Sequence, residues 1–162
     1  MRFFLDTEFY EDGSTIDLIS IGIAAEDGRE FYAVSQEAQL HRVSSWVRAN
    51  VLPRLPRYGD PAWMQRSFIA TEIQAFMQKD GTKPEVWAYY ADYDWVALCQ
   101  LYGTMMGLPK GFPMFCRDLK QLSVDVGSPT HPPDPEGEHN ALVDARWNRD
   151  LYTFLMAKKA DR

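Results

Sequence analysis

Three runs of apolar residues, separated by turn sequences, occupy the first 35 positions of the chain. The first run, at residues 2–8, starts with aromatic and aliphatic side chains, and the second, at residues 15–25, contains five isoleucine and leucine residues. The third run covers residues 29–35, and the sequences Glu11-Asp12-Gly13 and Asp27-Gly28 between the runs are typical of tight turns. This pattern predicts three sequential strands joined by short turns, an antiparallel meander.

The rest of the chain alternates between helical and strand-like patterns. Helices are predicted over residues 43–51, 62–79, 94–102, 118–124 and 140–156, and two more short strands over residues 86–90 and 114–116. The proline-rich segment 53–61 is a connector, because neither side of it is long enough to form a separate domain, and segment 128–137 is a proline-rich loop. We therefore predict one α/β domain over residues 1–162, in which helices pack on a mixed sheet of five or six strands.

Composition narrows the classes of protein that this domain can be. The 162 residues are 46% hydrophobic, enough for an ordinary packed core, and the net charge of −6 excludes a broad basic face that coats nucleic acid. Cys99 and Cys116 lack metal-ligand spacing, which favours free thiols in a reducing compartment. The residues before Asp6 are too few for a signal peptide, and no apolar run approaches the ~18 residues of a membrane span. These features predict a cytoplasmic protein.

Two carboxylates close the first apolar run. Asp6 and Glu8 flank Thr7, so in a strand they point to the same face, roughly 6.5 to 7 Å apart. At an effective dielectric near 20, two negative charges at that distance repel by roughly 2.4 kcal/mol, and burial adds to this cost. A divalent cation would remove the repulsion, so the pair is a candidate metal site. Two solvated acids at an exposed strand end are the alternative.

A third candidate acid stands where a predicted strand leads into a predicted helix. Asp94 follows Tyr93 at this junction. Aspartate is a favoured residue for capping the first turn of a helix, and capping would explain Asp94 without any function. Asp92, two residues earlier, competes with Asp94 for a functional role.

The last predicted helix adds a histidine and a fourth acid. His139 lies at its start and Asp144 in its second turn, on the face that would meet the sheet. A solvated histidine, or an aspartate paired with Arg146 or Arg149, would explain either residue without a function. Together with the three earlier acids, however, they make a set that could bind two divalent ions about 4 Å apart and act on a phosphodiester.

The motifs of this chain resemble those of the DEDDh 3′-to-5′ exonucleases, a superfamily that includes RNase T, oligoribonuclease and the proofreading subunit of bacterial DNA polymerase. The matching motifs are Asp6-Thr7-Glu8, Tyr93-Asp94, and His139 followed five residues later by Asp144. The chain is most similar to the RNase AS branch of small mycobacterial exoribonucleases, through the sequences FLDTEF at 4–9, LISIG at 18–22, ALCQL at 97–101 and HNALVDA at 139–145. The asparagine that usually precedes the second-motif aspartate is absent; Asp94 is chosen over Asp92 because an aromatic residue precedes it and a helix follows.

This resemblance implies an RNase H-like fold with two Mg²⁺ or Mn²⁺ ions held by Asp6, Glu8, Asp94 and Asp144, of which Asp6 would bridge both ions. His139 would act as the general base for the attacking water, which suits a histidine pKa near 6.5. The implied activity is release of nucleoside 5′-monophosphates from single-stranded RNA or 3′ overhangs, with a preference for adenylate. A homodimer is also implied.

Substrate-binding residues are predicted more loosely. Phe9 and Tyr10 follow the catalytic strand and could stack on the terminal base, although core packing also explains Phe9. Thr7, between the two acids, is another candidate. Residues 48–59 contain three arginines and no acid, which predicts a phosphate-guiding patch that includes Arg54 and Arg57, against the alternative of ordinary surface charge.

Three other functions are compatible with parts of this pattern. A 3′-to-5′ DNA exonuclease would carry the same five residues, because no residue of the motifs reports contact with a 2′-hydroxyl. A phosphatase with an aspartyl nucleophile would be expected to have aspartate in place of Glu8. A non-catalytic binding module would be expected to have lost at least one acid, and all four are present.

Overall fold

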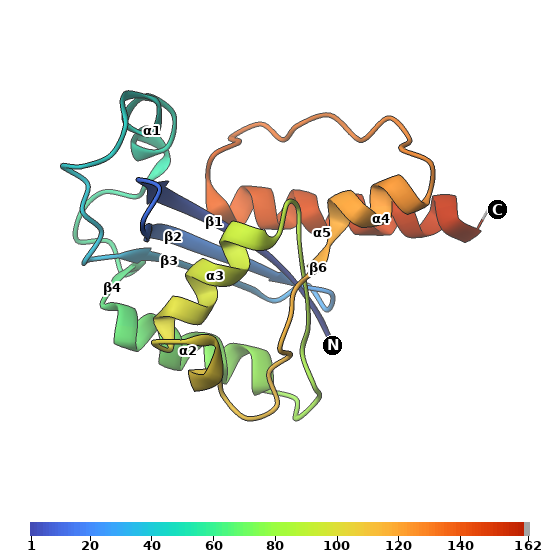
Figure 1. Ribbon diagram of the computed structural model, residues 1–162, viewed down its shortest axis with the longest axis horizontal. Helices are drawn as coiled ribbons and strands as arrows, with labels where there is room; N and C mark the ends of the chain where they lie inside the picture. The colour runs from blue at the N-terminus through green and yellow to red at the C-terminus, as the bar shows by residue number, and fades with distance from the viewer. Residues whose placement is uncertain (161–162) are drawn as a thin grey trace.

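The first residues of the chain form a central strand of a six-stranded sheet in the computed structural model, which describes residues 1–160 (Figure 1). Strand β1 (Arg2–Glu11) pairs antiparallel with β2 (Ile16–Ala25), which pairs antiparallel with β3 (Glu30–Ser35). The predicted meander is therefore confirmed. Three shorter strands run parallel to their neighbours and complete the order β4-β3-β2-β1-β5-β6: β4 (Trp63–Met64), β5 (Glu85–Ala88) and β6 (Arg117–Asp118).

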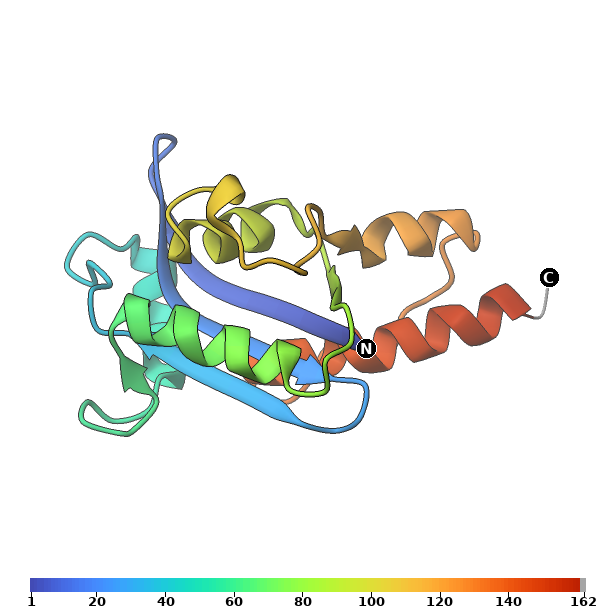
Figure 2. The same ribbon diagram turned by 90° about the horizontal axis from the view of Figure 1, so that it is seen from below.

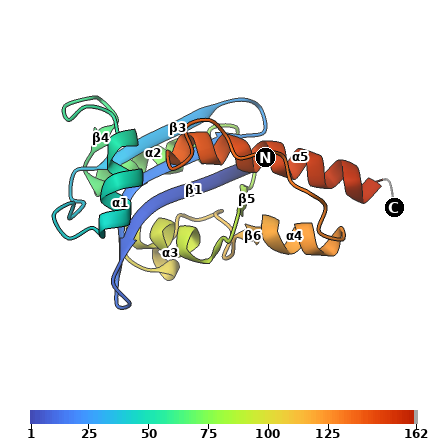
Figure 3. The same ribbon diagram turned by 90° about the horizontal axis from the view of Figure 1, so that it is seen from above.

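Helices cover both faces of this mixed sheet. The helix α2 (Arg66–Gln78) and the helix α3 (Asp92–Leu101) pack on one face (Figure 2). The long helix α5 (Ala141–Ala160) crosses the other face, with α4 (Leu119–Asp125) against it (Figure 3). The short helix α1 (Ser45–Asn50) lies near the end of β1, followed by the single turn η1 (Leu52–Arg54), and a second such turn, η2 (Met105–Gly107), follows α3. No helix in residues 1–160 has the length and apolar character to cross a membrane.

Alternation along β1 divides its side chains between two cores. Phe3 and Leu5 pack toward α2 and α3, whereas Phe4 packs toward α4 and α5, and all three are at most 1% exposed. Burying a side chain of this size stabilises the fold by about 1.5–3 kcal/mol. Because Asp6 and Glu8 follow Phe4 at intervals of two residues, the same alternation directs both acids to the face that α5 covers.

The contact between β2 and the start of α5 depends on a glycine. A Cβ atom added to Gly22 would lie 2.2 Å from the carbonyl oxygen of Ala141, so no other residue fits without moving one of the two backbones. Further along α5, the Asn148 side-chain amide donates a 2.9 Å hydrogen bond to the carbonyl of Leu5. These two contacts hold the first turns of α5 close to β1 and β2.

Three predicted elements differ from the structure in their position or length. Residues 114–116 do not form a strand; Met114 and Phe115 are exposed, and the pairing with β5 begins only at Arg117. The helix predicted from residue 62 begins at Arg66, because Trp63 and Met64 pair with the end of β3 as β4. The strand predicted over residues 86–90 ends at Ala88, and Tyr90 has a positive φ of 55° that turns the chain toward α3.

Candidate active site

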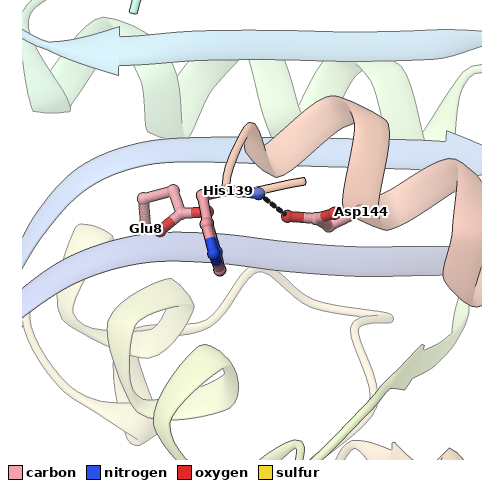
Figure 4. Close-up of side chains that lie close together, drawn as sticks. All are labelled: Glu8, His139 and Asp144. Atoms are coloured by element: carbon pink, nitrogen blue, oxygen red, sulfur yellow. Dashed lines mark hydrogen bonds between the residues drawn. The ribbon is translucent and has the colours of Figure 1, made fainter. Parts of the chain in front are cut away.

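The end of β1 and the start of α5 border a cavity of about 270 Å³. Asp6, Glu8, His139 and Asp144 all line it. The side chains of the last three lie close together (Figure 4), and one nitrogen or carboxylate oxygen from each lies within 4.8 Å of the others. The structure therefore brings together residues from the two ends of the chain, in an arrangement with the spacing of metal ligands.

Side chains of Asn140 and Asp144 set the local geometry at the start of α5. The Asn140 side-chain oxygen accepts hydrogen bonds from the backbone N–H groups of Leu142 and Val143, which caps the helix. His139, just before it, has a positive φ of 69°, and its backbone N–H donates a 2.8 Å hydrogen bond to Oδ2 of Asp144 (Figure 4). This bond fixes the Asp144 carboxylate beside the imidazole.

The alternative partners considered for Asp144 are engaged elsewhere. Arg146 forms an ion pair with Glu30 at 2.6 Å, and Arg149 lies 3.4 Å from Asp150. The interpretation of Asp144 as the partner of one of these arginines is therefore wrong. Its negative charge faces the cavity.

Asp94 reaches the same acids from α3. It is 6% exposed and lies inside the first turn of the helix, whereas Asp92 is exposed and Ala91 occupies the capping position. The capping interpretation of Asp94 is therefore wrong. Its Oδ1 instead accepts hydrogen bonds from the backbone N–H of Thr7, at 2.8 Å, and from the Thr7 hydroxyl, at 2.6 Å.

The length of β5 explains why Thr7 binds Asp94. Strand β5 pairs only with residues 2–4 of β1 and ends at Ala88. Beyond that point β1 has no neighbour on this side, so the backbone N–H of Thr7 needs another acceptor. The Asp94 carboxylate supplies it through Oδ1, and Oδ2 is then the oxygen that could hold a metal ion.

Burial raises the pKa of all four acids, and repulsion within the group adds to the shift at Asp6 and Glu8. Burial raises the pKa of Asp6 well above its usual range, and the neighbouring carboxylates of Asp94, Glu8 and Asp144 raise it further. Burial, together with Asp144 and Asp94, raises the pKa of Glu8 to about 8. Burial also raises the pKa of Asp94 to about 7, against the opposing hydrogen bonds from Thr7, and the pKa of Asp144 to about 6.

The donor set fits a hard divalent cation. Four carboxylates converge where burial disfavours their charge, and a cation would remove this penalty by neutralising them. Carboxylate oxygens are the ligands that Mg²⁺ and Mn²⁺ prefer, and the imidazole of His139 lies at the edge of the group. The residues present therefore suit one or two such ions.

Several further residues of the cavity were not predicted from the sequence. They come from the end of β5, from the loop before α5 and from the second turn of α5: Tyr89, Asp134, Pro135, Glu138, Trp147 and Asn148. Glu138 Oε2 lies 3.8 Å from Nε2 of His139, a proximity that their adjacency in the sequence could have suggested. Trp147 lies three residues after Asp144 and thus on the same face of α5, which the helical period could have revealed.

The histidine ring also has an aromatic neighbour that no motif indicated. Trp46 of α1 contacts the His139 imidazole edge to face, with ring centroids 4.9 Å apart. The side-chain amide of Asn140 donates to the carbonyl of Arg54 at 3.3 Å. Helix α1 and the turn η1 are thereby held against the start of α5, although about 90 residues separate them in the chain.

Two hydrogen bonds hold the loop before His139 against α4 and α5. The Trp147 indole donates a 3.0 Å hydrogen bond to the carbonyl of Pro133. A second hydrogen bond, 2.7 Å long, joins the Ser123 hydroxyl of α4 to Nε2 of His131. Through these contacts α4 and α5 set the position of one wall of the cavity.

The predicted substrate-binding residues occupy different surroundings. Thr7 lines the cavity, but both of its donors are used by Asp94. The register of β1 shifts between Glu8 and Phe9, and Phe9 stacks on Tyr93, with centroids 5.4 Å apart and planes 4° from parallel. Tyr10 packs in a separate cluster with Ile19 and residues of α1.

Arg54 and Arg57 are both exposed. The carbonyl of Arg54 is the acceptor for Asn140, so the backbone of this arginine lies next to the start of α5. Arg57 begins a turn closed by a hydrogen bond from the Asp60 N–H. Of the three arginines in the predicted patch, Arg54 is therefore the one with a contact to the start of α5.

Four acids and a histidine at the end of the central strand of such a sheet are the arrangement of the RNase H-like 3′-to-5′ exonucleases. The chain belongs to the family of 3′-5′ exoribonuclease Rv2179c-like domains, whose model matches residues 1–156. The 3′-5′ exoribonuclease Rv2179c of Mycobacterium tuberculosis strain H37Rv is 54% identical over 147 residues, which are 90% of this chain and 88% of that protein. These findings confirm the resemblance noted in the sequence and the class of enzyme that it implied.

Solved structures of known proteins share this fold. The Mg²⁺- and Mn²⁺-bound form of Pop2p from S. pombe superposes with a TM-score of 0.61 at 12% identity, over 99% of this chain and 84% of that one. The nuclease domain of 3′hExo, a DEDDh family member bound to rAMP, gives a TM-score of 0.61 at 10% identity, over 96% of this chain and 91% of that one. At these identities the likeness concerns the fold, and it confirms the predicted RNase H-like architecture.

Proposed function

We propose that this protein is a metal-dependent 3′-to-5′ exoribonuclease that removes nucleoside 5′-monophosphates from single-stranded RNA or 3′ overhangs. One observation carries the proposal: Asp6, Glu8, Asp144 and His139 line a single cavity, with the carboxylate of Asp94 close enough to raise the pKa of Asp6. The relative Rv2179c carries the name of a 3′-5′ exoribonuclease, which favours RNA over DNA as the substrate class.

The residues divide the work in the following way. Asp6, Glu8, Asp94 and Asp144 would supply the carboxylates that hold two divalent cations. When bound, these ions neutralise charge on the phosphodiester and lower the pKa of the attacking water. Thr7 orients Asp94 through two hydrogen bonds to Oδ1.

The imidazole of His139 accepts the proton of the attacking water. It lies beside Glu8 and Asp144 at the mouth of the cavity and is 31% exposed, so a proton taken there can pass on to solvent. The Trp46 ring limits the orientations that the imidazole can adopt. Glu138 Oε2 lies 3.8 Å from Nε2 of the same ring.

Substrate choice is the finer part of the proposal. We expect a preference for adenylate tails, because the chain resembles the RNase AS branch and because a solved structure of similar fold contains rAMP. Rates on poly(A), poly(U) and poly(C) test this directly. Equal rates on the three homopolymers would contradict the preference.

The proposal also covers the approach of the phosphates, the oligomeric state and the cellular compartment. Arg48, Arg54 and Arg57 are exposed on and after α1 and guide phosphates toward the cavity. The protein acts as a homodimer, which the exposed apolar side chains of Met105, Met106 and Phe115 support, and sedimentation at micromolar concentration tests this. Both cysteines are free, which agrees with a cytoplasmic, reducing environment.

The decisive experiment identifies the products. Matched RNA and DNA oligomers, labelled at either end, are incubated with Mg²⁺ or Mn²⁺ and analysed by mass spectrometry. We expect nucleoside 5′-monophosphates from the 3′ end of RNA, and no products with a chelator. Faster degradation of the DNA oligomer would favour the alternative, a 3′-to-5′ DNA exonuclease, and absence of products with every metal would remove the proposal.

A further inference from the structure

Tyr90 has a backbone conformation that is unusual for its residue type. Its φ of 55° lies in the left-handed region, which glycine and asparagine adopt readily and which bulky aromatic residues disfavour. The residue forms the turn between β5 and α3, and its side chain is 60% exposed. Neither the packing of the core nor the turn itself requires an aromatic ring at this position, and costly backbone conformations are concentrated at functional sites.

The Tyr90 ring is connected to the cavity through its neighbour. The rings of Tyr89 and Tyr90 meet edge to face with centroids 4.7 Å apart, and Tyr89 lines the cavity that contains the catalytic acids. On its other side, the ammonium group of Lys120 lies 5.9 Å from the centroid of the Tyr90 ring. Tyr90 is therefore one ring contact away from the cavity, and Lys120 lies next to the exposed Tyr90 ring.

A single aspartate holds the two residues in place. Oδ2 of Asp118 accepts a 3.2 Å hydrogen bond from the backbone N–H of Ala91, directly after Tyr90. Oδ1 of the same side chain accepts the backbone N–H of Lys120. The Asp118 carboxylate thus joins the turn that contains Tyr90 to the first turn of α4, which contains Lys120. These backbone contacts fix the relative position of the two residues.

The negative charge of the nearby cavity indicates a role for Lys120. Seven arginines of the described chain form ion pairs with carboxylates: Arg2, Arg29, Arg42, Arg66, Arg117, Arg146 and Arg149. Lys120 instead lies over the Tyr90 ring, which contacts Tyr89 in the wall of a cavity that five carboxylates line. Such a cavity repels the phosphates of an approaching polyanion, and a cation near it offsets that repulsion.

We propose that Tyr90 and Lys120 form a binding subsite for the nucleotide on the 5′ side of the scissile phosphodiester. The base of that nucleotide stacks on the Tyr90 ring, and its phosphate contacts the Lys120 ammonium, the combination by which proteins bind single strands without reading their sequence. The inference rests on the proposed exonuclease function and adds to it a route for the strand, over the turn between β5 and α3.

The first test separates the subsite from the chemistry by the length of the substrate. A p-nitrophenyl ester of a nucleoside 5′-monophosphate carries one nucleotide, whereas an RNA tetranucleotide extends past the scissile bond. In Tyr90→Gly, the ratio of kcat/KM for the tetranucleotide to kcat/KM for the ester should fall by about tenfold, the usual effect of losing one stacked base. Tyr90→Phe keeps the ring and should restore the wild-type ratio.

Tyr90→Gly is suited to this purpose because glycine adopts a φ of 55° without strain. The variant should keep the circular dichroism spectrum and the Tm of the wild type, so a loss of RNA hydrolysis cannot be assigned to unfolding. Phe68→Ala is the matched control, since Phe68 is 52% exposed on α2, on the opposite face of the sheet from α5. Its ratio should equal that of the wild type.

The second test concerns charge. Lys120→Ala should reduce the slope of log Kd against log salt concentration by about 0.7, the value for one phosphate contact on a single strand. Lys79→Ala, which removes an exposed lysine at the end of α2, should leave the slope unchanged. Binding is measured with an RNA oligomer in Ca²⁺, under conditions where hydrolysis is slow.

The outcomes that overturn the subsite differ from those that overturn the function. If the wild type cleaves both substrates and Tyr90→Gly changes neither their ratio nor the RNA affinity, the subsite is refuted while the exonuclease stands. If the wild type cleaves neither substrate, the proposed function fails first. If Tyr90→Gly and Lys120→Ala instead change the sedimentation coefficient, this surface is a protein interface and the RNA subsite is refuted.

Discussion

Thr7 donates two hydrogen bonds to one oxygen of Asp94, from its backbone N–H at 2.8 Å and from its hydroxyl at 2.6 Å. The two residues are 87 positions apart in the chain, and both are 6% exposed. Hydrogen bonds to an ionised carboxylate contribute about 1.5–3 kcal/mol each in such surroundings. The pair therefore joins α3 to the catalytic strand and orients the carboxylate that the second sequence motif supplies.

Replacement of Thr7 by valine tests this orienting role. Thr7→Val preserves the shape and the backbone bond but removes the hydroxyl donor, so Asp94 keeps one of its two hydrogen bonds. We expect a loss of about 1–3 kcal/mol of stability and weaker binding of Mn²⁺ by calorimetry. Thr7→Ser retains the hydroxyl and should behave like the wild type; equal metal affinities in all three proteins would show that the hydroxyl has no such role.

Asp6→Asn should separate stability from activity. Asp6 experiences repulsion from three other carboxylates, so a neutral amide relieves the metal-free protein and should raise its Tm. The same change should abolish turnover and weaken metal binding, because it removes one of the four carboxylates that would neutralise the bound cations. Thermal unfolding in a chelator, together with metal titration, measures both effects. A lower Tm with unchanged metal affinity would contradict the placement of Asp6 at the centre of the acid cluster.

His139→Ala should behave differently from the acid variants. Its metal affinity and RNA affinity should remain near wild type, while kcat falls by about 10² to 10⁴, the usual contribution of a positioned general base. The wild-type rate should rise with pH on the acidic side of its optimum, and this limb should flatten in the variant. If His139→Ala lost its metals or unfolded, the residue would be a ligand or a structural histidine instead.

The stability of the metal-free protein should fall as the pH rises. The folded-state pKa of Glu8 is about 8, above the ordinary value of 4.5, so the folded protein binds a proton that the unfolded chain has released. This contribution is fully present below pH 4.5 and is lost as the pH rises toward 8, and Asp144, with a pKa of about 6, adds the same trend over a narrower window.

Saturating Mg²⁺ should remove this dependence, because a bound cation replaces the protons. Denaturant midpoints between pH 5 and pH 8, in a chelator and in Mg²⁺, measure both curves. A midpoint that is flat over this range in the chelator would show that the acids are better solvated than their burial indicates.

Local periodicity predicted more of the site than of its surroundings. Alternation along β1 placed Asp6 and Glu8 on one face, and the helical period placed Asp144 toward the sheet, because both depend only on neighbouring residues. The partner of Asp94 could not be predicted in this way. It depends on β5 ending early and leaving the N–H of Thr7 without a strand, which is a property of the assembled sheet.

The wrong prediction of a strand at residues 114–116 also arises from a property of the assembled sheet. The run Met114-Phe115-Cys116 has the composition of a buried strand, yet the edge of the sheet accepts only the two residues that follow it. The register shift after Glu8 is likewise a property of the pairing with β2, where Ile19 is passed over, and no local pattern of residues 2–11 indicates it. Strand propensity indicates which segments can form a strand. The neighbouring strands determine which of their residues pair.

Gly22→Ala should damage the active site by displacing the start of α5. The added Cβ would lie 2.2 Å from the Ala141 carbonyl oxygen, a distance that only movement of the backbone can relieve. Because His139 and Asp144 flank this point, we expect both a loss of stability of about 1–3 kcal/mol and a fall in kcat as the start of α5 shifts away from Glu8.

Gly28→Ala is the matched control for this substitution. Gly28 has a positive φ of 88° at the tip of the hairpin between β2 and β3, with nothing within 4 Å of an added Cβ. The control should therefore lose stability through backbone strain while keeping kcat at temperatures where it is folded. Urea unfolding and single-turnover rates, measured on both variants well below their Tm, separate the two effects. Equal kcat values for Gly22→Ala and Gly28→Ala would show that the position of α5 tolerates more displacement than the geometry of His139, Asp144 and Glu8 implies.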